Sequence, residues 1–260
     1  MVIRRIREHV AAQNWFAVGI DVVIVIIGVF LGMQASNWNQ ERIVREQGRE
    51  YRDRMIADIR SNEVDYLHRQ TYYREVRRHA EAALAALDRP SGDGGGAFLI
   101  ASYQASQITF RKIKRFTYDE LLSTGGIERL GDAKFREQIA NYYTSVETGG
   151  VILDFVPLYR EHLRQVMPHT VQQAIRKNCP ETVVRAVDGS ASVSLPKVCS
   201  LGLDRATVDK AAAAVRSMPS IRNDLTRLLA DLEAKLWLTG PGIDNARLMR
   251  AMIEREQESR

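Results

Sequence analysis

The sequence predicts an all-α protein in which one amino-terminal transmembrane helix continues into a long helix and then an extracytoplasmic helical bundle. Three observations predict this architecture. Residues 15–33 carry no ionisable side chain except Asp21, residues 37–88 contain no proline, and later segments repeat apolar residues at helical spacing. A chain of 260 residues suffices for one such domain beside a membrane segment.

The first element is the apolar stretch WFAVGIDVVIVIIGVFLGM. As a helix, its nineteen residues rise about 28 Å, which matches the hydrocarbon core of a bilayer. A buried helix of a soluble protein is an alternative, although such a helix is rarely apolar on every face. A cleavable signal peptide would need small residues where Met33 and Gln34 stand. We therefore predict an uncleaved transmembrane helix over 15–36, with Trp15 and Trp38 as anchors at the two water interfaces.

Positive charge before the span predicts its orientation. The leading segment contains three arginines, Arg4, Arg5 and Arg7, whereas the flank after the span alternates acidic and basic side chains. Short segments rich in Lys and Arg stay on the cytoplasmic side. We therefore predict that residues 1–14 form a basic cytoplasmic segment and that residues 37–260 lie outside the cytoplasm.

The remaining elements are helices separated by turn residues. Residues 37–88 predict one long helix that continues from the span and ends at Arg89-Pro90. Further helices are predicted over 97–110, 118–123, 133–167, 204–218, 219–238 and 243–257. Thr117 is the predicted cap of the short helix, with Glu120 completing a capping box, and Asp204 is the predicted cap of a later one.

Glycine and proline predict where two of these helices bend or stop. Gly149-Gly150 and Pro157 are expected to bend or interrupt the 133–167 segment. Thr239-Gly240-Pro241-Gly242 is expected to end the 219–238 helix, whose apolar stripe comprises Ile221, Leu225, Leu228, Leu229, Leu232 and Leu236.

Two cysteines bracket a segment without helical periodicity. We predict that residues 178–200 form an irregular loop and that Cys179 and Cys199 are joined by a disulfide, which persists only in an oxidising compartment such as the periplasm. Two unrelated free thiols remain the alternative. Neither cysteine belongs to a CxxC pair and no histidine is near, so the sequence predicts no zinc site here.

Two short patterns of residues stand out in the chain. A Q..NWN.E pattern follows the acidic residue and the Ile/Val-rich span, and comprises Gln34, Asn37, Trp38, Asn39 and Glu41. A TY.EL.S.G pattern comprises Thr117, Tyr118, Glu120, Leu121, Ser123 and Gly125, and the pair Tyr142-Tyr143 follows it. In this order the patterns resemble a family of uncharacterised bacterial single-span membrane proteins, although Ser36 and the cysteine-bracketed segment depart from it. The resemblance implies a membrane-anchored domain of unknown function and no particular activity. With the charge asymmetry, it predicts a single-pass protein of the bacterial inner membrane with a periplasmic carboxy-terminal domain.

Three residues of the predicted span could mediate contact with a second helix. Asp21, Gly28 and Gly32 fall on one helix face to within about 40°. Glycines four residues apart let two helices approach closely in lipid, and a carboxylate gains by facing a partner rather than acyl chains. We therefore predict a homodimer formed through the transmembrane helix, with chance occurrence of the glycines as the alternative.

The sequence supplies no recognisable catalytic machinery, cofactor site or metal site. Five histidines (His9, His68, His79, His162, His169) form no metal-binding spacing, and no phosphate loop or nucleophile elbow is present. The net charge of +5 is spread along the chain and does not predict nucleic-acid binding. Only RKIKR at 111–115 is locally basic, as either a solvated helix end or a contact for an anionic lipid or polymer.

Two classes of function fit this sequence. The first is a noncatalytic interaction, scaffold or sensory module that is anchored in the lipid bilayer, self-associates through its span and binds an envelope protein partner. The second is a membrane-tethered envelope enzyme or maintenance factor whose active site cannot be recognised in the sequence. We favour the first, and a pocket with convergent ionisable groups would favour the second.

Overall fold

The computed structural model describes residues 15–89, 94–185 and 191–258, with side chains from Gly19 onward. The predicted all-α class is confirmed, because helices dominate these residues and the strands are short. The elements in chain order are α2 (Trp15–Leu87), α3 (Gly95–Ala105), α4 (Phe116–Ser123), the 3₁₀ helix η1 (Gly126–Arg129), α5 (Ala133–Leu153), α6 (Leu158–Val166), α7 (His169–Asn178), β1 (Thr182–Arg185), β2 (Ala191–Ser194), α8 (Arg205–Arg216) and α9 (Ile221–Glu258). The chain divides into two compact units, residues 1–51 and 52–260.

The first unit contains the beginning of α2. This helix includes the predicted span and runs on to Leu87, so the prediction of one helix continuing beyond the span is confirmed. The boundary between the compact units lies after Tyr51, and residues 37–46 are exposed.

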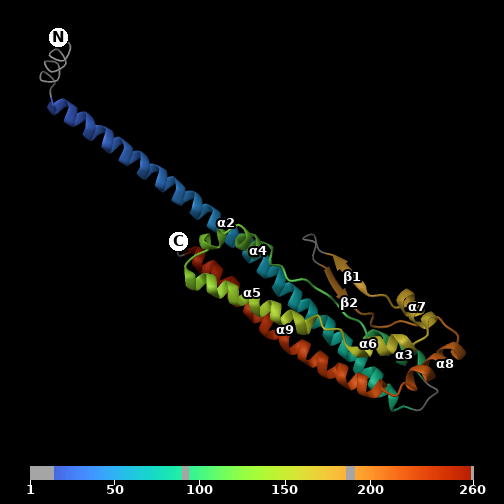
Figure 1. Ribbon diagram of the computed structural model, residues 1–260. Coiled ribbons are helices and arrows are strands. Elements are labelled where there is room, and N and C mark those ends of the chain that lie inside the picture. Colours follow the sequence, from blue (N-terminus) through green and yellow to red (C-terminus); the bar gives the residue numbers. More distant parts are fainter. Residues whose placement is uncertain (1–14, 90–93, 186–190, 259–260) are drawn as a thin grey trace, which may run out of the picture. The chain divides into compact units, whose positions relative to one another are not determined.

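The second unit is built on three long helices. Figure 1 shows the later part of α2 beside α5 and α9. Bonds between side chains agree with this view: the Asn62 amide donates to the Tyr142 hydroxyl over 3.4 Å, and Arg250 donates to Glu63 over 2.7 Å. The shorter α3 contacts both α7 and α8.

The core of this unit is formed by apolar residues at helical spacing, although Leu229 and Leu236 of the predicted α9 stripe are only half-buried. Residues at helical spacing on α2 are buried (Met55, Ile59, Tyr66, Tyr73, Val76 and Ala80), as are residues of α5 (Phe135, Ile139, Tyr142 and Val146) and α9 (Leu225, Leu228 and Leu232). Removing this surface from water is the main favourable contribution to folding.

The predicted end of the helix at Thr239–Gly242 is wrong. Instead, α9 continues from Ile221 to Glu258 and includes Pro241. Pro241 is exposed, so water can solvate the carbonyl that its missing N–H leaves unpaired. Gly242 lies against the ring of Tyr66: a Cβ atom there would be 2.6 Å from Tyr66 Cε1. The glycine therefore provides a close contact between α9 and α2 rather than a stop.

The predicted capping box at Thr117 is also wrong. The short helix α4 begins at Phe116 with no side-chain cap, and the Thr117 N–H donates instead to Asp58 of α2 over 3.0 Å. At α8 the prediction is confirmed, because Asp204 is the N-cap and accepts from the Thr207 N–H over 2.9 Å.

The predicted long segment 133–167 is two helices. Gly149 and Gly150 lie within α5 without ending it. The interruption comes at residues 154–157, and Pro157 is the residue that precedes α6. Proline at this point is expected, since it cannot continue the preceding helix but is compatible with the start of the next.

The segment 178–200, predicted to be irregular, contains a β-hairpin. The strands β1 and β2 pair antiparallel, with Thr182 opposite Ser194 and Arg185 opposite Ala191. Valine and threonine favour this pairing, and the composition that made the segment look like a loop is that of a short hairpin.

Candidate functional site

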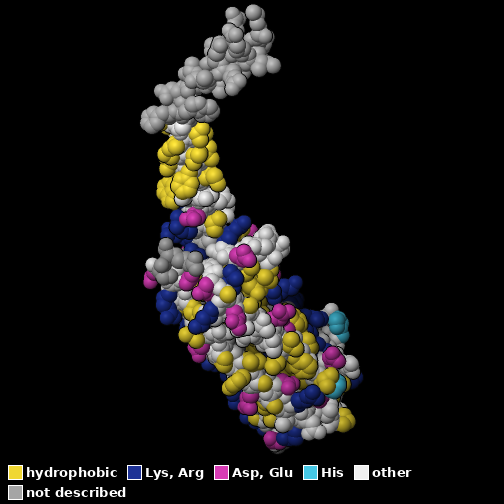
Figure 2. Space-filling view, turned by 60° about the vertical axis from the view of Figure 1, so that its left-hand side comes forward, with side chains coloured by type: hydrophobic (Ala, Val, Ile, Leu, Met, Phe, Trp, Pro, Cys, Tyr) yellow, Lys and Arg dark blue, Asp and Glu magenta, His cyan; other side chains and the backbone are white. Residues whose placement is uncertain are grey.

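The apolar stretch of α2 is exposed on every described face. From Ile20 to Met33 the large hydrophobic side chains are 44–63% exposed, and Figure 2 shows them covering the visible face of this stretch. Among the described residues, this is the segment that is long and apolar enough to cross a membrane. Such a surface is unfavourable in water and calls for a covering of lipid or protein.

The residues predicted to mediate self-association lie on this open helix. A Cβ atom added at Gly28 or Gly32 would meet nothing within 4 Å, so the described part of the chain leaves the backbone at both glycines accessible. Asp21 lies on the same helix, and Trp38 is 65% exposed after the span. Arg4, Arg5 and Arg7 lie outside the described residues, as does the side chain of Trp15.

The structure joins Cys179 and Cys199 in a disulfide. Their Cα atoms are 5.4 Å apart and the bond closes the base of the β-hairpin. The Cys179 carbonyl accepts a hydrogen bond from the buried Gln104 of α3 over 3.1 Å. The bond therefore fixes the end of α7 and the start of the hairpin against the helical core.

Three contacts attach the hairpin to the rest of the domain. The Tyr72 hydroxyl donates to Glu181 over 2.7 Å, and the Leu195 N–H donates to Glu75 over 2.7 Å. Arg111 donates to the Ala191 carbonyl. In each contact a side chain from elsewhere in the domain binds the hairpin. These contacts hold the hairpin at its base and at β2.

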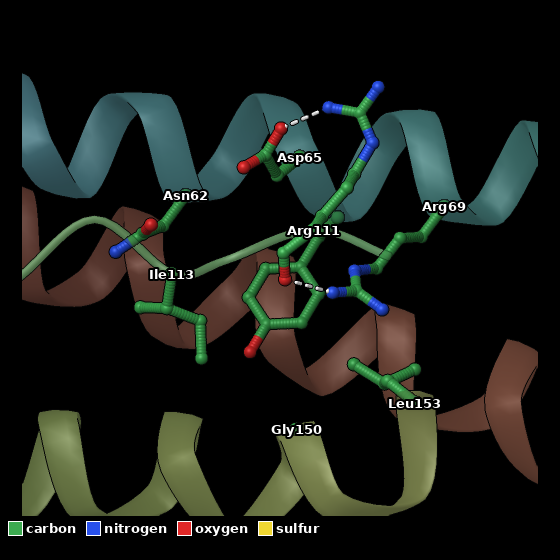
Figure 3. A pocket seen from close by; sticks show the side chains of 8 residues that line it. Asn62, Asp65, Arg69, Arg111, Ile113, Gly150 and Leu153 are labelled. Atoms are coloured by element: carbon green, nitrogen blue, oxygen red, sulfur yellow. Dashed lines mark hydrogen bonds and ion pairs between the residues drawn. The ribbon is translucent and has the colours of Figure 1, made fainter. Parts of the chain in front are cut away.

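An extended segment, residues 107–115, runs alongside α2 in the opposite direction and is called the strap below. Figure 3 shows its contacts with α2. The Asn62 amide donates to the Lys114 carbonyl over 2.9 Å and accepts from the Lys114 N–H over 2.7 Å. Arg69 donates to the Arg111 carbonyl over 2.5 Å, and Arg111 pairs with Asp65. Side chains of α2 therefore supply the partners that a neighbouring strand would supply in a sheet.

Arg69 is a buried charge at the centre of these contacts. Its side chain is 4% exposed and pairs with Asp154 over 2.8 Å. It also donates to the Tyr73 hydroxyl over 3.3 Å. Burial alone would lower the pKa of Arg69, but Tyr73 and Asp154 outweigh it and hold the pKa above its ordinary value. The guanidinium is therefore a permanent charge that joins α2, the strap and the end of α5.

Lys235 of α9 is a second buried cation beside this group. Its ammonium donates to the Leu153 and Phe155 carbonyls over 3.0 and 2.6 Å, at the carboxy-terminal end of α5. Burial, and then the nearby Arg69, lower the pKa of Lys235 to about 8. A cation at this end of a helix is favourable because the last carbonyls have no partner within the helix.

The cavity between these groups is small. It is lined by Asn62, Asp65, Tyr66, Arg69, Arg111, Ile113, Gly150 and Leu153, and its volume of about 10 Å³ is at the lower limit for one water molecule. The charged side chains around it bind one another and the main chain. Chemically, this arrangement holds the strap in place and leaves no room for a substrate.

The basic run RKIKR divides between the two faces of the strap. Arg111 pairs with Asp65, and Arg115 pairs with Asp119 over 2.8 Å and Glu147 over 3.1 Å. Lys112 and Lys114 are exposed between two exposed aromatic residues, Phe110 and Phe116. Both arginines of this run therefore pair with acidic side chains of the domain, whereas its two lysines are exposed.

The second sequence pattern meets α2 and α5. Tyr118 stacks on Tyr143 with ring centroids 4.4 Å apart, and Arg54 of α2 pairs with Glu120. With the Thr117–Asp58 contact, the pattern lies against residues 54–62 of α2, which indicates a role in packing.

Four histidines belong to the described residues: His68, His79, His162 and His169. His162 contacts Asp224 over 2.8 Å, and burial lowers the pKa of both His68 and His79. Among the described residues, no group of three or more His, Cys, Asp or Glu side chains could hold a metal ion.

The ionic network was not foreseen from the sequence, because its partners are far apart in the chain. Arg69 and Asp154 are separated by 85 residues, and neither belongs to a motif. The sequence around Arg69 lacks proline and glycine, which predicts a helix but does not indicate an ionic network. Compared with known proteins, the chain matches no protein-family model, no curated protein and no solved structure.

Proposed function

We propose that this protein is a single-span membrane protein whose helical domain serves outside the cytoplasm as a noncatalytic interaction, scaffold or sensory module. The observation that carries this proposal is the apolar stretch of α2, which is exposed on every described face between Ile20 and Met33. A helix of this length and composition is stabilised by a bilayer and not by water.

Two further features support the proposed orientation and compartment. The arginines Arg4, Arg5 and Arg7 favour a cytoplasmic amino terminus. The Cys179–Cys199 bond persists in an oxidising compartment such as the periplasm. The resemblance to uncharacterised bacterial single-span membrane proteins supports the same placement, with the span in the inner membrane.

The cavity at the Arg69 network offers no site for the alternative, a membrane-tethered envelope enzyme. The charged groups around Arg69 are engaged with one another, and the cavity among them has a volume of only about 10 Å³. Two larger hollows among the described residues, of about 400 and 570 Å³, are open to solvent, and both have charged side chains in their lining. At the junction of α5 and α6, by contrast, four large hydrophobic side chains are exposed: Val151, Ile152, Phe155 and Leu158. Exposed apolar patches mark sites of protein interaction, which suits an envelope protein partner.

The topology is tested by fusing reporters after Arg260 in the full chain. We expect alkaline phosphatase, which needs disulfides and folds outside the cytoplasm, to be active. Replacing Arg4, Arg5 and Arg7 by glutamate should reduce that activity, because the charge asymmetry is removed. Activity of a reporter that works only in the cytoplasm would contradict the proposal.

Self-association of the anchor is tested by cross-linking in membranes. The double variant Gly28→Leu and Gly32→Leu should give several-fold less dimer than the wild type, because leucines separate the helix backbones. Gly19→Leu is the matched control, since Gly19 lies nine residues before Gly28, about 180° around the helix. Equal dimer yields from all three proteins would contradict self-association through Gly28 and Gly32.

A further inference from the structure

The β-hairpin leaves one edge unpaired. β1 bonds to β2 in a two-stranded sheet, and all four residues of β1 are exposed. β2 lies toward the strap, where its Ala191 carbonyl accepts from Arg111, and Figure 1 shows β1 on the other side of the hairpin. Unpaired N–H and C=O groups along such an edge are a template for another strand.

Both faces of this edge strand carry exposed apolar side chains. Val183 is 50% exposed and Val184 is 60% exposed, and they point to opposite faces because side chains alternate along a strand. Edge strands that remain single are commonly very short or carry a charge, a proline or a bulge. β1 is four residues long and ends in Arg185, but it has neither a proline nor a bulge.

The sequence around β1 is self-complementary in charge. The run Glu181-Thr-Val-Val-Arg185 has an acid at one end and a base at the other. Within the described residues, Arg185 has no ion pair, whereas Glu181 accepts a bond from the Tyr72 hydroxyl and interacts electrostatically with Arg160. In an antiparallel pair with a second copy, centred on Val183, each Glu181 lies opposite the partner's Arg185.

We propose that the outer edge of β1 pairs antiparallel with β1 of a second copy of this chain, across a twofold axis at Val183. The result is a four-stranded sheet. Val183 lies opposite the partner's Val183 on one face, and Thr182 lies opposite the partner's Val184 on the other, so the exposed valines become cross-strand pairs. Pairing in any other register loses the two charge contacts.

A contact of four residues is too small to hold two free proteins together, since stable interfaces bury about 1,200–2,000 Å². Two chains confined to one membrane meet at a much higher effective concentration, which makes a short edge sufficient. The inference therefore rests on the proposed membrane anchorage but needs no particular packing of the anchors.

Cysteine cross-linking of the full chain in membranes tests the pairing. In Val183→Cys, the two introduced Cβ atoms are about 5 Å apart across the axis, close enough for a disulfide after a small shift. In the matched control Val184→Cys, the two cysteines are diagonal neighbours about 7–8 Å apart. We expect at least about five times more disulfide-linked dimer from Val183→Cys. Equal yields, or more dimer from Val184→Cys, would overturn the proposal.

Charge substitutions in the Val183→Cys background test the register. Arg185→Glu should lower the dimer yield several-fold, and adding Glu181→Arg should restore it. Tyr72→Phe controls for the hydrogen bond that Glu181 loses, and should leave the yield unchanged. A yield that does not respond to Arg185→Glu would overturn the register at Val183.

The anchor glycines separate this inference from the proposed function. If Gly28→Leu with Gly32→Leu leaves the excess of Val183→Cys over Val184→Cys dimer intact, the strands pair without the anchor contact. If the excess disappears only in that variant, pairing of β1 follows pairing of the anchors. In both cases an excess in the otherwise unaltered protein supports the strand contact.

Discussion

Arg69 shows how a single charge is accommodated inside this domain. Its guanidinium is almost completely buried, and its donors reach Asp154, the Tyr73 hydroxyl and the Arg111 carbonyl. A charge can be kept from water only when such partners replace its hydration. Removing the arginine would leave an acid and a carbonyl without their donor.

We expect Arg69→Met to lower the free energy of unfolding by about 2–3 kcal/mol, less than for a fully buried pair because Asp154 is partly exposed. The matched control is Arg77→Met, whose ion pairs with Glu81 of the same helix and Glu233 of α9 lie on the surface. It should cost less than about 0.5 kcal/mol. Denaturant unfolding of the full chain in detergent measures both, and equal losses would contradict this account of Arg69.

The shifted pKa of Lys235 predicts a dependence of stability on pH. In the unfolded chain the pKa of this lysine is near 10.5, whereas burial lowers it to about 8 in the folded protein. Between these two values the unfolded state binds more protons, so the free energy of unfolding rises as pH increases from about 8 to 10.5. Below pH 8 both states are protonated and this contribution no longer changes.

The test compares the wild type with Lys235→Met across this pH range. The wild type should gain up to about 3 kcal/mol relative to the variant, because other titrating groups affect both proteins alike. Denaturant midpoints at several pH values give the difference. Parallel curves for the two proteins would show that Lys235 titrates at its ordinary pKa.

Among the elements, α9 illustrates how a tertiary contact overrides a local signal. Thr239-Gly240-Pro241-Gly242 has the composition of a turn. The Thr239 hydroxyl donates to the Leu236 carbonyl of its own helix and accepts from Gln70 of α2. The contact with Gln70 fixes this part of α9 against α2, and the residues remain helical.

The two glycines of α9 should therefore respond oppositely to alanine. Gly242→Ala places a Cβ atom 2.6 Å from the buried Tyr66 ring, and should cost about 1–2 kcal/mol after the gain in helix propensity is subtracted. At Gly240 the same change meets nothing within 4 Å and should stabilise by about 0.5–1 kcal/mol. Thermal unfolding distinguishes them, and a stabilised Gly242→Ala would show that Tyr66 moves freely.

The elements that could be predicted are those whose signals are local. Asp204 caps α8 through a bond to a residue three positions away, and the apolar stripe of α2 is a property of that helix alone. The failures have distant causes. Thr117 was expected to cap α4, but Asp58 of another helix takes its N–H.

In the molecule as a whole, the disulfide links stability to redox conditions. Cys179 and Cys199 were visible as a pair because both flank one segment, whereas the Arg69 network joins residues from α2, the strap and the end of α5. A repeating pattern in the sequence does not indicate which distant residues will come into contact. The cysteine-bracketed segment and its bond could thus be located in advance, whereas the hairpin within it and the ionic network could not.

Removal of the disulfide should destabilise the whole helical domain. The variant Cys179→Ser with Cys199→Ser frees a separation of 20 residues, which is expected to cost about 3 kcal/mol and to lower the Tm by several degrees. Adding a reductant to the wild type should reproduce this shift, and should leave the double variant unchanged. An identical Tm for the oxidised and reduced wild type would mean that the bond constrains little.

The attachment of the strap through its main chain has a further consequence. Asn62 and Arg69 bind backbone atoms of Lys114 and Arg111, so they recognise the path of the chain rather than its outward side chains. Inserting or deleting one residue between those two positions would turn the side chains on one side of the change to the opposite face, so either Arg111 or Arg115 would turn toward solvent, since side chains alternate in extended backbone. Evolutionary drift in this segment should therefore tolerate new residues at Lys112 and preserve its length.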